Sequence, residues 1–266
     1  SDTKHVRVGP VTIGNDLPFV LISGPCQIES RDHALFMADA LARIAARAGV
    51  PFIFKSSLDK ANRTSVSGKR GVGIDAGLAI LAEVKASLGC PVLTDIHGPD
   101  QVEAAAQAVD ILQIPAFLCR QTDLLRAAGQ TGKIVNIKKG QWMTPEDMLG
   151  AVEKARAAGA SSVTVTERGT FFGYGDLIVD MRSFQRIRTA CGVPVIFDGT
   201  HSLQRLGRAS GSRGNDWELT PTLVRASVAA GCDGLFLEVH PDPASAPSDG
   251  TTMLPLDQLK PLLECV

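Results

Sequence analysis

Eight short apolar runs along the chain each carry, at or just beyond their ends, a side chain that can bind an anion, ligate a metal ion or move a proton. In chain order these side chains are Cys26, Lys55, Asp95, Gln113, Lys138, Arg168, His201 and Glu238. Lysine and arginine bind phosphate and carboxylate groups, whereas thiol, imidazole and carboxylate groups are ligands for divalent metals. If the fold brings these residues together, they form one pocket for anions with a metal site beside it.

The runs themselves are rich in Val, Ile, Leu and Phe, and amphipathic helical segments separate them. They predict strands at about 19–24, 52–56, 92–96, 111–115, 134–138, 163–167, 194–198 and 234–238. Strands that alternate with helices favour a parallel sheet, and continuous apolar runs are typical of strands buried on both faces. Eight such units predict an α/β fold of the (β/α)8 TIM-barrel type, whose active sites lie where the C-terminal strand ends converge.

Cap residues and apolar periodicity predict the helices and the domain limits. Ser30 is a predicted N-cap for a helix that ends near residue 47, and Thr144-Pro145-Glu146-Asp147 predicts the opening of another. Further helices are predicted at about 75–88, 99–109 and 120–128, and from Leu256 onward. The segments VRVG and VTIGN predict a hairpin at about 6–15 that plugs the lower end of the barrel. We expect one domain over residues 1–266, with 1–15 as an N-terminal hairpin.

Composition narrows the function classes. The 266 residues are 44% hydrophobic, enough for a large core, and a net charge of −1 gives no indication of a nucleic-acid or membrane partner. Apolar stretches stay below the ~20 residues of a membrane span, and the first ten residues lack a signal-peptide core, so we expect a cytoplasmic protein. The six cysteines are widely spaced without a CxxC pair, which argues against a disulfide framework.

Positive side chains gather at the predicted strand ends and in the loops just after them. They are Lys55, Lys60, Arg63, Lys138 and Arg168. Each could simply pair with a nearby acid, but five on one face with few acids nearby in sequence favour a ligand with several negative charges. The segment Lys60–Ser65 combines a lysine, an amide, a guanidinium and two hydroxyls, a suitable clamp for a phosphate monoester. Its composition alone slightly favours an ordinary solvated loop.

A metal site is predicted from closure of the ring. In a closed barrel, strands 7, 8 and 1 are consecutive, so Cys26, His201 and Glu238 become neighbours, and Asp249 could supply a fourth ligand. These donors suit Zn²⁺, Fe²⁺ or Mn²⁺. The alternative makes Cys26 a small buried hydrophobe and His201 a satisfied polar residue, and spacing alone does not decide between them. His240 is a rival ligand, because strand alternation points it the same way as Glu238.

Four loops on the site face are longer than a barrel requires: 57–73, 169–178, 202–217 and 241–254. Long loops on the active-site face are candidate lids.

The motifs carry a resemblance that covers nearly the whole chain. They are GPCQIES, FKSSLDKANRTS, LTDIHGPDQ, LQIPAFLCRQTDL, NIKKGQ, TERGTFFGYGDLIVDM, PVIFDGTHSLQ and LFLEVHPDPASAPSDG. The chain resembles the 3-deoxy-D-manno-octulosonate-8-phosphate synthases. The resemblance implies condensation of phosphoenolpyruvate with D-arabinose 5-phosphate, release of inorganic phosphate, and a place in lipopolysaccharide precursor synthesis. The KANR segment is the most discriminating, since the sister family that uses erythrose 4-phosphate has a KPR-type segment there.

The resemblance implies a role for each matching residue. Those that hold phosphoenolpyruvate are Lys60, Lys138, Arg168 and Gln113, with Lys55 and Ser57 close by. Those that hold the arabinose phosphate are Asn62, Arg63, Thr64 and Ser65, with Thr64 in place of the more usual Ser. Lys60, Lys138, Asp95 and His201 are implied to take part in the reaction. Because metal-independent members carry Asn where this chain has Cys26, it resembles the metal-dependent branch, with Cys26, His201, Glu238 and Asp249 as ligands and His240 left out. The resemblance also implies a homotetramer.

Three other functions are weighed against this one. The first is the sister reaction, 3-deoxy-D-arabino-heptulosonate-7-phosphate synthesis from erythrose 4-phosphate. The second is a Schiff-base aldolase in which Lys55 or Lys138 is the amine nucleophile, since neighbouring cations lower the pKa of a lysine. The third is a barrel that senses sugar phosphates without catalysis, which would leave the metal ligands and Asp95 without a purpose.

Overall fold

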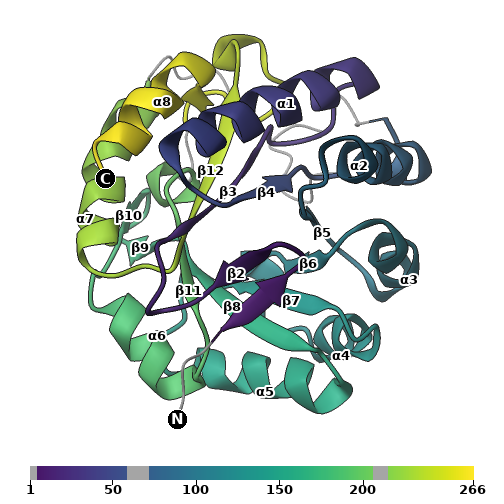
Figure 1. Cartoon of the computed structure of the whole chain (residues 1–266). Coiled ribbons are helices and arrows are strands. Elements are labelled where there is room, and N and C mark those ends of the chain that lie inside the picture. The colour runs from purple at the N-terminus through teal and green to yellow at the C-terminus, as the bar shows by residue number, and fades with distance from the viewer. Residues whose placement is uncertain (1–4, 59–71, 206–214) are drawn as a thin grey trace.

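The computed structural model describes residues 5–58, 72–205 and 215–266. Within these residues, eight parallel strands form a closed barrel, because β12 pairs with both β11 and β3 (Figure 1). The barrel strands are β3 (Val20–Gly24), β4 (Phe52–Lys55), β5 (Val92–Asp95), β6 (Ile111–Ile114), β7 (Ile134–Lys138), β8 (Ser162–Glu167), β11 (Val195–Asp198) and β12 (Gly234–His240). The predicted TIM barrel and its eight strands are confirmed.

Helices surround the barrel, as expected when each parallel crossover returns over the sheet (Figure 1). They are α1 (Arg31–Ala48), α2 (Ile74–Leu88), α3 (Pro99–Ala108), α4 (Thr122–Gln130), α5 (Met148–Ala158), α6 (Ser183–Cys191), α7 (Thr220–Ala229) and α8 (Leu256–Glu264). Short 3-10 turns η1 (Ala116–Leu118), η2 (His201–Leu203), η3 (Asp216–Leu219) and η4 (Pro243–Ser245) and the short strand β13 (Leu254–Pro255) complete the connections. Ser30 caps α1 as predicted, because its hydroxyl accepts the His33 N–H at 3.1 Å.

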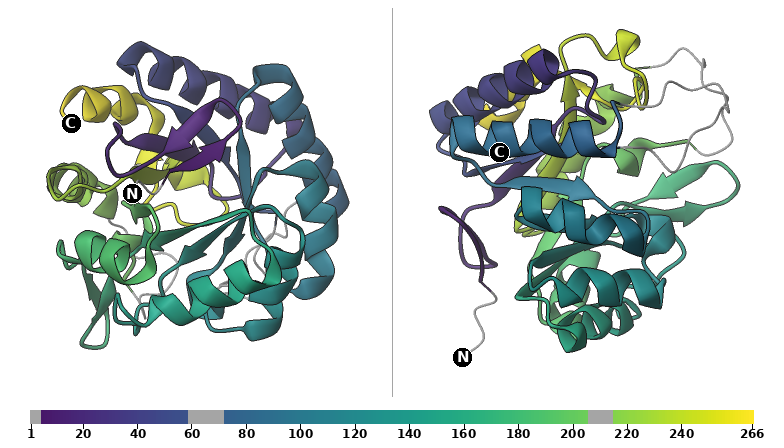
Figure 2. Two further views of the ribbon diagram at one scale, coloured as in Figure 1. Left: turned by 60° about the horizontal axis from the view of Figure 1, so that its bottom comes forward. Right: turned by 90° about the vertical axis from the view of Figure 1, so that its right-hand side faces the viewer.

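The N-terminal hairpin plugs the barrel. Strands β1 (Val6–Val8) and β2 (Val11–Ile13) pair antiparallel. They lie at the opposite end of the barrel from the hairpin of β9 (Thr170–Phe172) and β10 (Asp176–Ile178) (Figure 2). Their inward side chains form one buried cluster with inward side chains of the barrel strands, such as Ile22, Ile53 and Phe236. This apolar plug leaves the other end of the barrel interior for polar groups.

Alternation along each strand divides the residues into two sets. Side chains such as Leu21, Phe54 and Phe197 point outward and form the larger core with the helices. Side chains on the other face point into the barrel, where they are apolar near the plug and polar at the C-terminal ends. Those polar residues include Lys55, Asp95, Gln113, Lys138, Asp198 and Glu238, all buried.

Two local expectations differ from the structure. Helix α5 begins at Met148 rather than near Thr144, because the N–H groups of Met148 and Leu149 bond only three residues back, to the Pro145 and Glu146 carbonyls, and so form a turn that precedes the helix. The predicted loop 169–178 contains a hairpin, β9 (Thr170–Phe172) and β10 (Asp176–Ile178). Parts of the loops 57–73 and 202–217 lie outside the described residues, and a lid role for any of the four loops stays a prediction. None of the helices in the described residues combines the length and the apolar character that a bilayer span needs.

The plug predicts a stability effect. Ile13 is fully buried in the plug cluster, so Ile13→Ala should lower the free energy of unfolding by about 2–5 kcal/mol through lost burial and a residual cavity. The matched change Arg7→Ala, at an exposed position of the same hairpin, should have an effect below ~0.5 kcal/mol. Urea unfolding of both variants measures this, and equal midpoints would contradict a plug that supports the barrel.

Candidate active site

Closure of the barrel brings the two ends of the chain together at the pocket. Glu238 of β12 is in register with Gly24 of β3, and Cys26 follows two residues later. Lys55 of the next strand donates to the Cys26 carbonyl at 2.9 Å and to Glu238 Oε1 at 2.7 Å. One buried ammonium group therefore joins the first, second and last strands of the barrel.

Cys26, Glu238 and Asp249 form a group that could hold a metal ion. One ligand atom from each lies within 4.8 Å of the others, and the Cys26 Sγ is 3.1 Å from Asp249 Oδ2. The Ser248 hydroxyl donates to the same sulfur at 2.8 Å. A thiolate and two carboxylates are suitable donors for a borderline divalent metal.

His201 stands beside this group. Its Nε2 is 3.1 Å from Asp249 Oδ2 and 3.5 Å from Glu238 Oε1. Its Nδ1 is 2.7 Å from Asp198 Oδ2, a carboxylate that also pairs with Lys138 Nζ at 2.7 Å. A carboxylate on one ring nitrogen fixes the tautomer that presents the other nitrogen to a metal. The structure thus brings the four predicted ligands together and adds Asp198 behind the imidazole.

Burial and charge shift the pKa values of this pair in opposite directions. Burial lowers the pKa of His201, but the charge of Asp198 outweighs it and the net pKa is raised. Burial raises the pKa of Asp198, but the His201 and Lys138 charges outweigh it and the net pKa is lowered. Asp198 therefore stays ionised at neutral pH and favours the imidazolium form of His201 when no metal is bound.

Asp249 has a backbone conformation that few residues adopt. Its φ of 55° makes it the one non-glycine residue with positive φ in the described part of the chain. Such a conformation costs on the order of 1 kcal/mol and is concentrated at functional sites. Here it directs the carboxylate toward Cys26 and His201.

The described part of the pocket has more acids than permanent cations. The permanent cations are Lys55, Lys138 and Arg168, and the acids are Asp95, Asp198, Glu238 and Asp249. Two of the cations form ion pairs, Lys55 with Glu238 and Lys138 with Asp198. The sequence suggested few acids for these lysines because their partners lie on distant strands. On the Cys26 side, the two carboxylates Glu238 and Asp249, the thiol and the His201 imidazole are donors that suit a bound cation.

Arg168 is the strand-end cation best placed for an anion. Its side chain is buried, and its Nη2 donates to Gln204 Oε1 at 2.5 Å. Its Nη1 is buried without a hydrogen-bond partner among the described residues. Burial lowers the pKa of its guanidinium against the opposing effect of Asp198 and Asp249, but arginine remains charged at neutral pH. A buried guanidinium with an unused N–H is a receptor for a carboxylate or phosphate oxygen.

A chain of hydrogen bonds lines the wall of the pocket that β4 to β7 form. Ser57 Oγ and Gln113 Nε2 both donate to Asp95, and Asn136 Nδ2 donates to Gln113 Oε1 at 2.8 Å. All four side chains are buried. These bonds hold Asp95 and Gln113 rigidly, as a site for small polar ligands requires.

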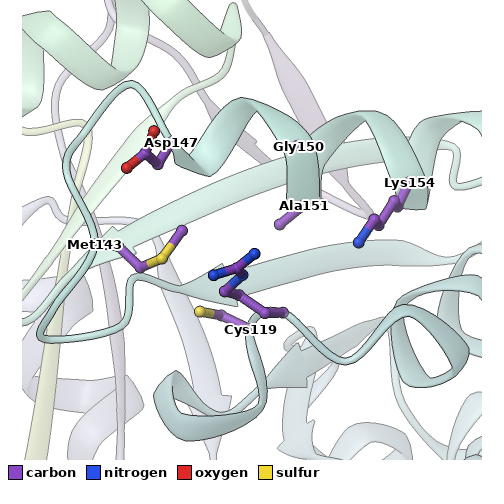
Figure 3. Close-up of a pocket in the computed structure, with 7 residues that line it drawn as sticks. Cys119, Met143, Asp147, Gly150, Ala151 and Lys154 are labelled. Carbon is purple, nitrogen blue, oxygen red and sulfur yellow. The ribbon is translucent and has the colours of Figure 1, made fainter.

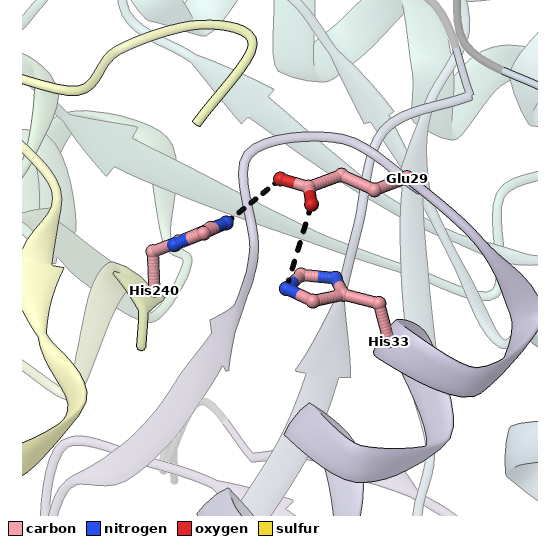
Figure 4. A group of neighbouring side chains, drawn as sticks. All are labelled: Glu29, His33 and His240. Carbon is pink, nitrogen blue, oxygen red and sulfur yellow. Dashed lines mark hydrogen bonds and ion pairs between the residues drawn. The ribbon is translucent and has the colours of Figure 1, made fainter. Parts of the chain in front are cut away.

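His240 does not join the Cys26 group. It forms a second group with Glu29 and His33 (Figure 4), where its Nε2 is 2.8 Å from Glu29 Oε1 and its Nδ1 accepts the Asp242 N–H at 3.0 Å. Because Nδ1 is an acceptor, the neutral ring carries its proton on Nε2 and donates it to Glu29. A metal ligand needs the reverse arrangement, with the second nitrogen as donor. His240 is therefore held as a link between two loops.

The predicted residues Lys60, Asn62, Arg63, Thr64 and Ser65 lie outside the described residues. Conversely, Asp198 and Asn136 were not predicted as site residues. Asp198 is the last residue of its strand, as Lys55 and Asp95 are of theirs, so the same strand-end position indicates it. His201, three residues later, was predicted as the site residue of this strand instead. Asn136 lies inside a strand on the inward face, where only alternation indicates it.

A separate cavity of about 320 Å³ lies between η1 and α5, with Cys119, Arg120, Met143 and Lys154 among its lining residues (Figure 3). Lys154 donates there to Thr122 at 2.8 Å. None of the predicted site residues lines it.

Comparison with known proteins agrees with this geometry. Residues 2–266 match the DAHP synthetase I family. The chain belongs to this family. It is 54% identical over 260 residues to the 2-dehydro-3-deoxyphosphooctonate aldolase of Rickettsia bellii (strain OSU 85-389), which covers 98% of this chain and 94% of that protein. The proteins of the same name from Rickettsia canadensis and Rickettsia prowazekii are 53% and 52% identical with the same coverage. The resemblance drawn from the motifs is confirmed.

The Asp198–His201 contact predicts a pKa change. Asp198→Asn removes the charge that favours the imidazolium, so burial then dominates and the pKa of His201 should fall below its ordinary value of 6.5. NMR titration of the ring resonances in metal-stripped protein measures it. Asp110→Asn, which removes an outer carboxylate paired with Lys85, is the charge-matched control. A His201 pKa unchanged by Asp198→Asn would contradict the electrostatic assignment.

Proposed function

We propose that this enzyme condenses phosphoenolpyruvate with D-arabinose 5-phosphate and water, and releases 3-deoxy-D-manno-octulosonate 8-phosphate and inorganic phosphate, a step in lipopolysaccharide precursor synthesis. The observation that carries the proposal is the buried Arg168 guanidinium, with its unused Nη1, in the same pocket as the Cys26–Glu238–Asp249 group. The name of relatives that are 52–54% identical over nearly the full chain supports it.

Phosphoenolpyruvate fits the cationic side of the pocket. Its carboxylate and phosphate take the N–H groups of Arg168 and Lys138, with Lys60 added from the loop after β4, and Gln113 lies on the wall held by Asn136. Arg63, Thr64 and Ser65 would bind the phosphate of the pentose. The amide of Asn62 would help to hold the sugar above phosphoenolpyruvate, with the aldehyde of the sugar facing the enol. Ser57 and Lys55 would lie close to phosphoenolpyruvate, where their bonds to Asp95 and Glu238 hold them in place.

The reaction then follows from orientation. C3 of the enol attacks the aldehyde carbon, water adds at C2, and phosphate leaves by cleavage of its C–O bond. Asp95, held by two hydrogen bonds, stabilises positive charge that develops at C2, and the lysine ammonium groups stabilise the growing alkoxide. The pair Asp198–His201 can hold or release a proton at the imidazole.

Cys26, His201, Glu238 and Asp249 are the proposed ligands of a divalent ion, Zn²⁺, Fe²⁺ or Mn²⁺. The thiol, the imidazole and the two carboxylates are a donor set that fits such an ion. When bound, the ion can polarise the aldehyde oxygen or lower the pKa of a water molecule, and we favour orientation of the substrate as its main contribution.

The decisive experiment measures phosphate release from phosphoenolpyruvate with a panel of aldose phosphates. Arabinose 5-phosphate should give turnover, whereas erythrose 4-phosphate should be poorer by at least about tenfold in kcat/KM, because a shorter chain cannot reach both sites. Preference for erythrose 4-phosphate would establish the sister activity instead. Borohydride trapping of a substrate on the protein would establish the Schiff-base alternative, and absence of turnover would leave a sensor.

Cys26 allows a test of the metal site that does not depend on turnover. Cys26→Ala should weaken Co²⁺ binding at least about tenfold and abolish the thiolate-to-cobalt absorption band. Cys191→Ala, at another buried cysteine far from the pocket, should preserve both. An unchanged band in Cys26→Ala would exclude the thiolate as a ligand. In Cys26→Asn, activity that stays fully chelator-sensitive would contradict the orienting role.

We also propose that residues 1–266 act as one cytoplasmic domain that assembles into a homotetramer. Exposed apolar side chains on the site face support the assembly. They are Phe117, Trp142, Phe171, Phe172, Tyr174 and Ile178. The rings of Phe117 and Trp142 stack at 6.2 Å, and contiguous exposed aromatic surface is typical of protein interfaces.

This surface predicts the effect of a charge. Phe172→Asp places a carboxylate on the exposed hairpin β9–β10, so it should dissociate the tetramer while the fold is kept. Sedimentation at micromolar concentration reports the mass, with Arg43→Asp, at an exposed position of α1, as the control. A tetramer that persists in Phe172→Asp would place the interface elsewhere.

A further inference from the structure

Lys139 and Glu167 form a buried ion pair directly behind the pocket wall. Each is the chain neighbour of a pocket cation, since Lys139 follows Lys138 and Glu167 precedes Arg168. Alternation sends Lys138 and Arg168 into the barrel and sends Lys139 and Glu167 to the outer side. There Lys139 Nζ lies 3.2 Å from Glu167 Oε2, and both side chains are 0% exposed.

The pair is a poor source of stability. Apart from the Lys139 ammonium, neither carboxylate oxygen of Glu167 has a well-directed hydrogen-bond partner among the described residues. Burial raises the pKa of Glu167, against the opposing charge of Lys139. A buried ion pair whose polar atoms are incompletely satisfied is often no more stable than an apolar pair of the same size. Stability alone therefore gives little reason for two charges at this place.

The contacts of Lys139 indicate another role. Its Nζ donates to the Met143 carbonyl at 3.1 Å and to Thr170 Oγ1 at 3.2 Å. Its backbone N–H donates to the Thr166 carbonyl at 2.8 Å and so extends the β7–β8 ladder by one residue. The ammonium group thus joins the loop after β7, the end of β8 and the start of β9, the segments that carry Lys138 and Arg168.

We propose that Lys139 and Glu167 are positioning residues that fix the ends of β7 and β8, so that Lys138 and Arg168 converge on one anionic substrate. The inference rests on the proposed function, in which these two cations hold phosphoenolpyruvate. A shift of about 1 Å in such groups is enough to reduce turnover by up to about a hundredfold. The pair is too deeply buried to exchange its partners with a ligand, so it holds the geometry in the free and the bound enzyme alike.

The test is the double variant Lys139→Met/Glu167→Leu, which replaces the charges by apolar groups of similar size. Its urea midpoint should equal or exceed that of the parent. Its KM for phosphoenolpyruvate should rise about tenfold, while its KM for arabinose 5-phosphate stays within about twofold. Direct calorimetric binding of phosphoenolpyruvate should weaken by the same factor. The single variant Lys139→Arg, which keeps the charge, should retain most of the parent's affinity for phosphoenolpyruvate.

The control is Arg188→Met, which breaks an ion pair with the buried Asp233 near the N-terminal ends of the strands. It should lower stability and leave both KM values unchanged. A double variant that binds phosphoenolpyruvate as the parent does would overturn the positioning role. If the parent enzyme itself neither binds phosphoenolpyruvate nor releases phosphate from it, the proposed function fails first, and the two failures are distinguished.

Discussion

The pairing of β12 with β3 is the interaction on which the pocket depends. It runs in register over five residues from Gly234↔Val20 to Glu238↔Gly24. Without it, Cys26 and Glu238 would stand at opposite edges of an open sheet. On the other side of β3, Gly24 permits a close approach to β4, because a Cβ atom there would lie 1.6 Å from the Lys55 carbonyl oxygen. A side chain at residue 24 would separate β3 from β4 and carry Cys26 away from the lysine that donates to its carbonyl.

Closure also concentrates charge that the sequence keeps apart. Lys55 neutralises Glu238 and Lys138 neutralises Asp198, so two of the strand-end lysines are partnered before any ligand arrives. Among the described residues, Arg168 has no carboxylate as close, and its Nη1 has no hydrogen-bond partner there. The pocket therefore has two halves of different character. One half collects carboxylates around a thiol and an imidazole and favours a cation, and the other presents a buried guanidinium and favours an anion.

Most of the fold and much of the site could be predicted from the sequence because both follow from one repeat. Apolar runs located all eight barrel strands, and the residue at or just after each run located Lys55, Asp95, His201 and Glu238. The predicted start of helix α5 was wrong, because the same residues can open a turn or a helix. The Thr144 hydroxyl accepts the Asp147 N–H in a turn, and the helix begins only at Met148. It missed Asp198 and Asn136, because a single sequence shows the face of a residue but not its partner across the barrel. The bond from Asn136 to Gln113 joins two strands, and no local pattern contains it.

The dipeptides Lys138-Lys139 and Glu167-Arg168 show how one strand pair serves both sides of its wall. On the inner side, Lys138 pairs with Asp198 next to the pocket, where a ligand oxygen can replace or share the carboxylate. On the outer side, Lys139 pairs with Glu167 where no ligand can reach. Two lysine–carboxylate pairs of the same chemical type therefore differ in their access to a ligand, because the Cβ atoms of the one pair point into the barrel and those of the other point out. The inner pair can respond to substrate, while the outer pair resists movement of the same backbone, and rigid support for an adaptable inner surface is what a preorganised anion site requires.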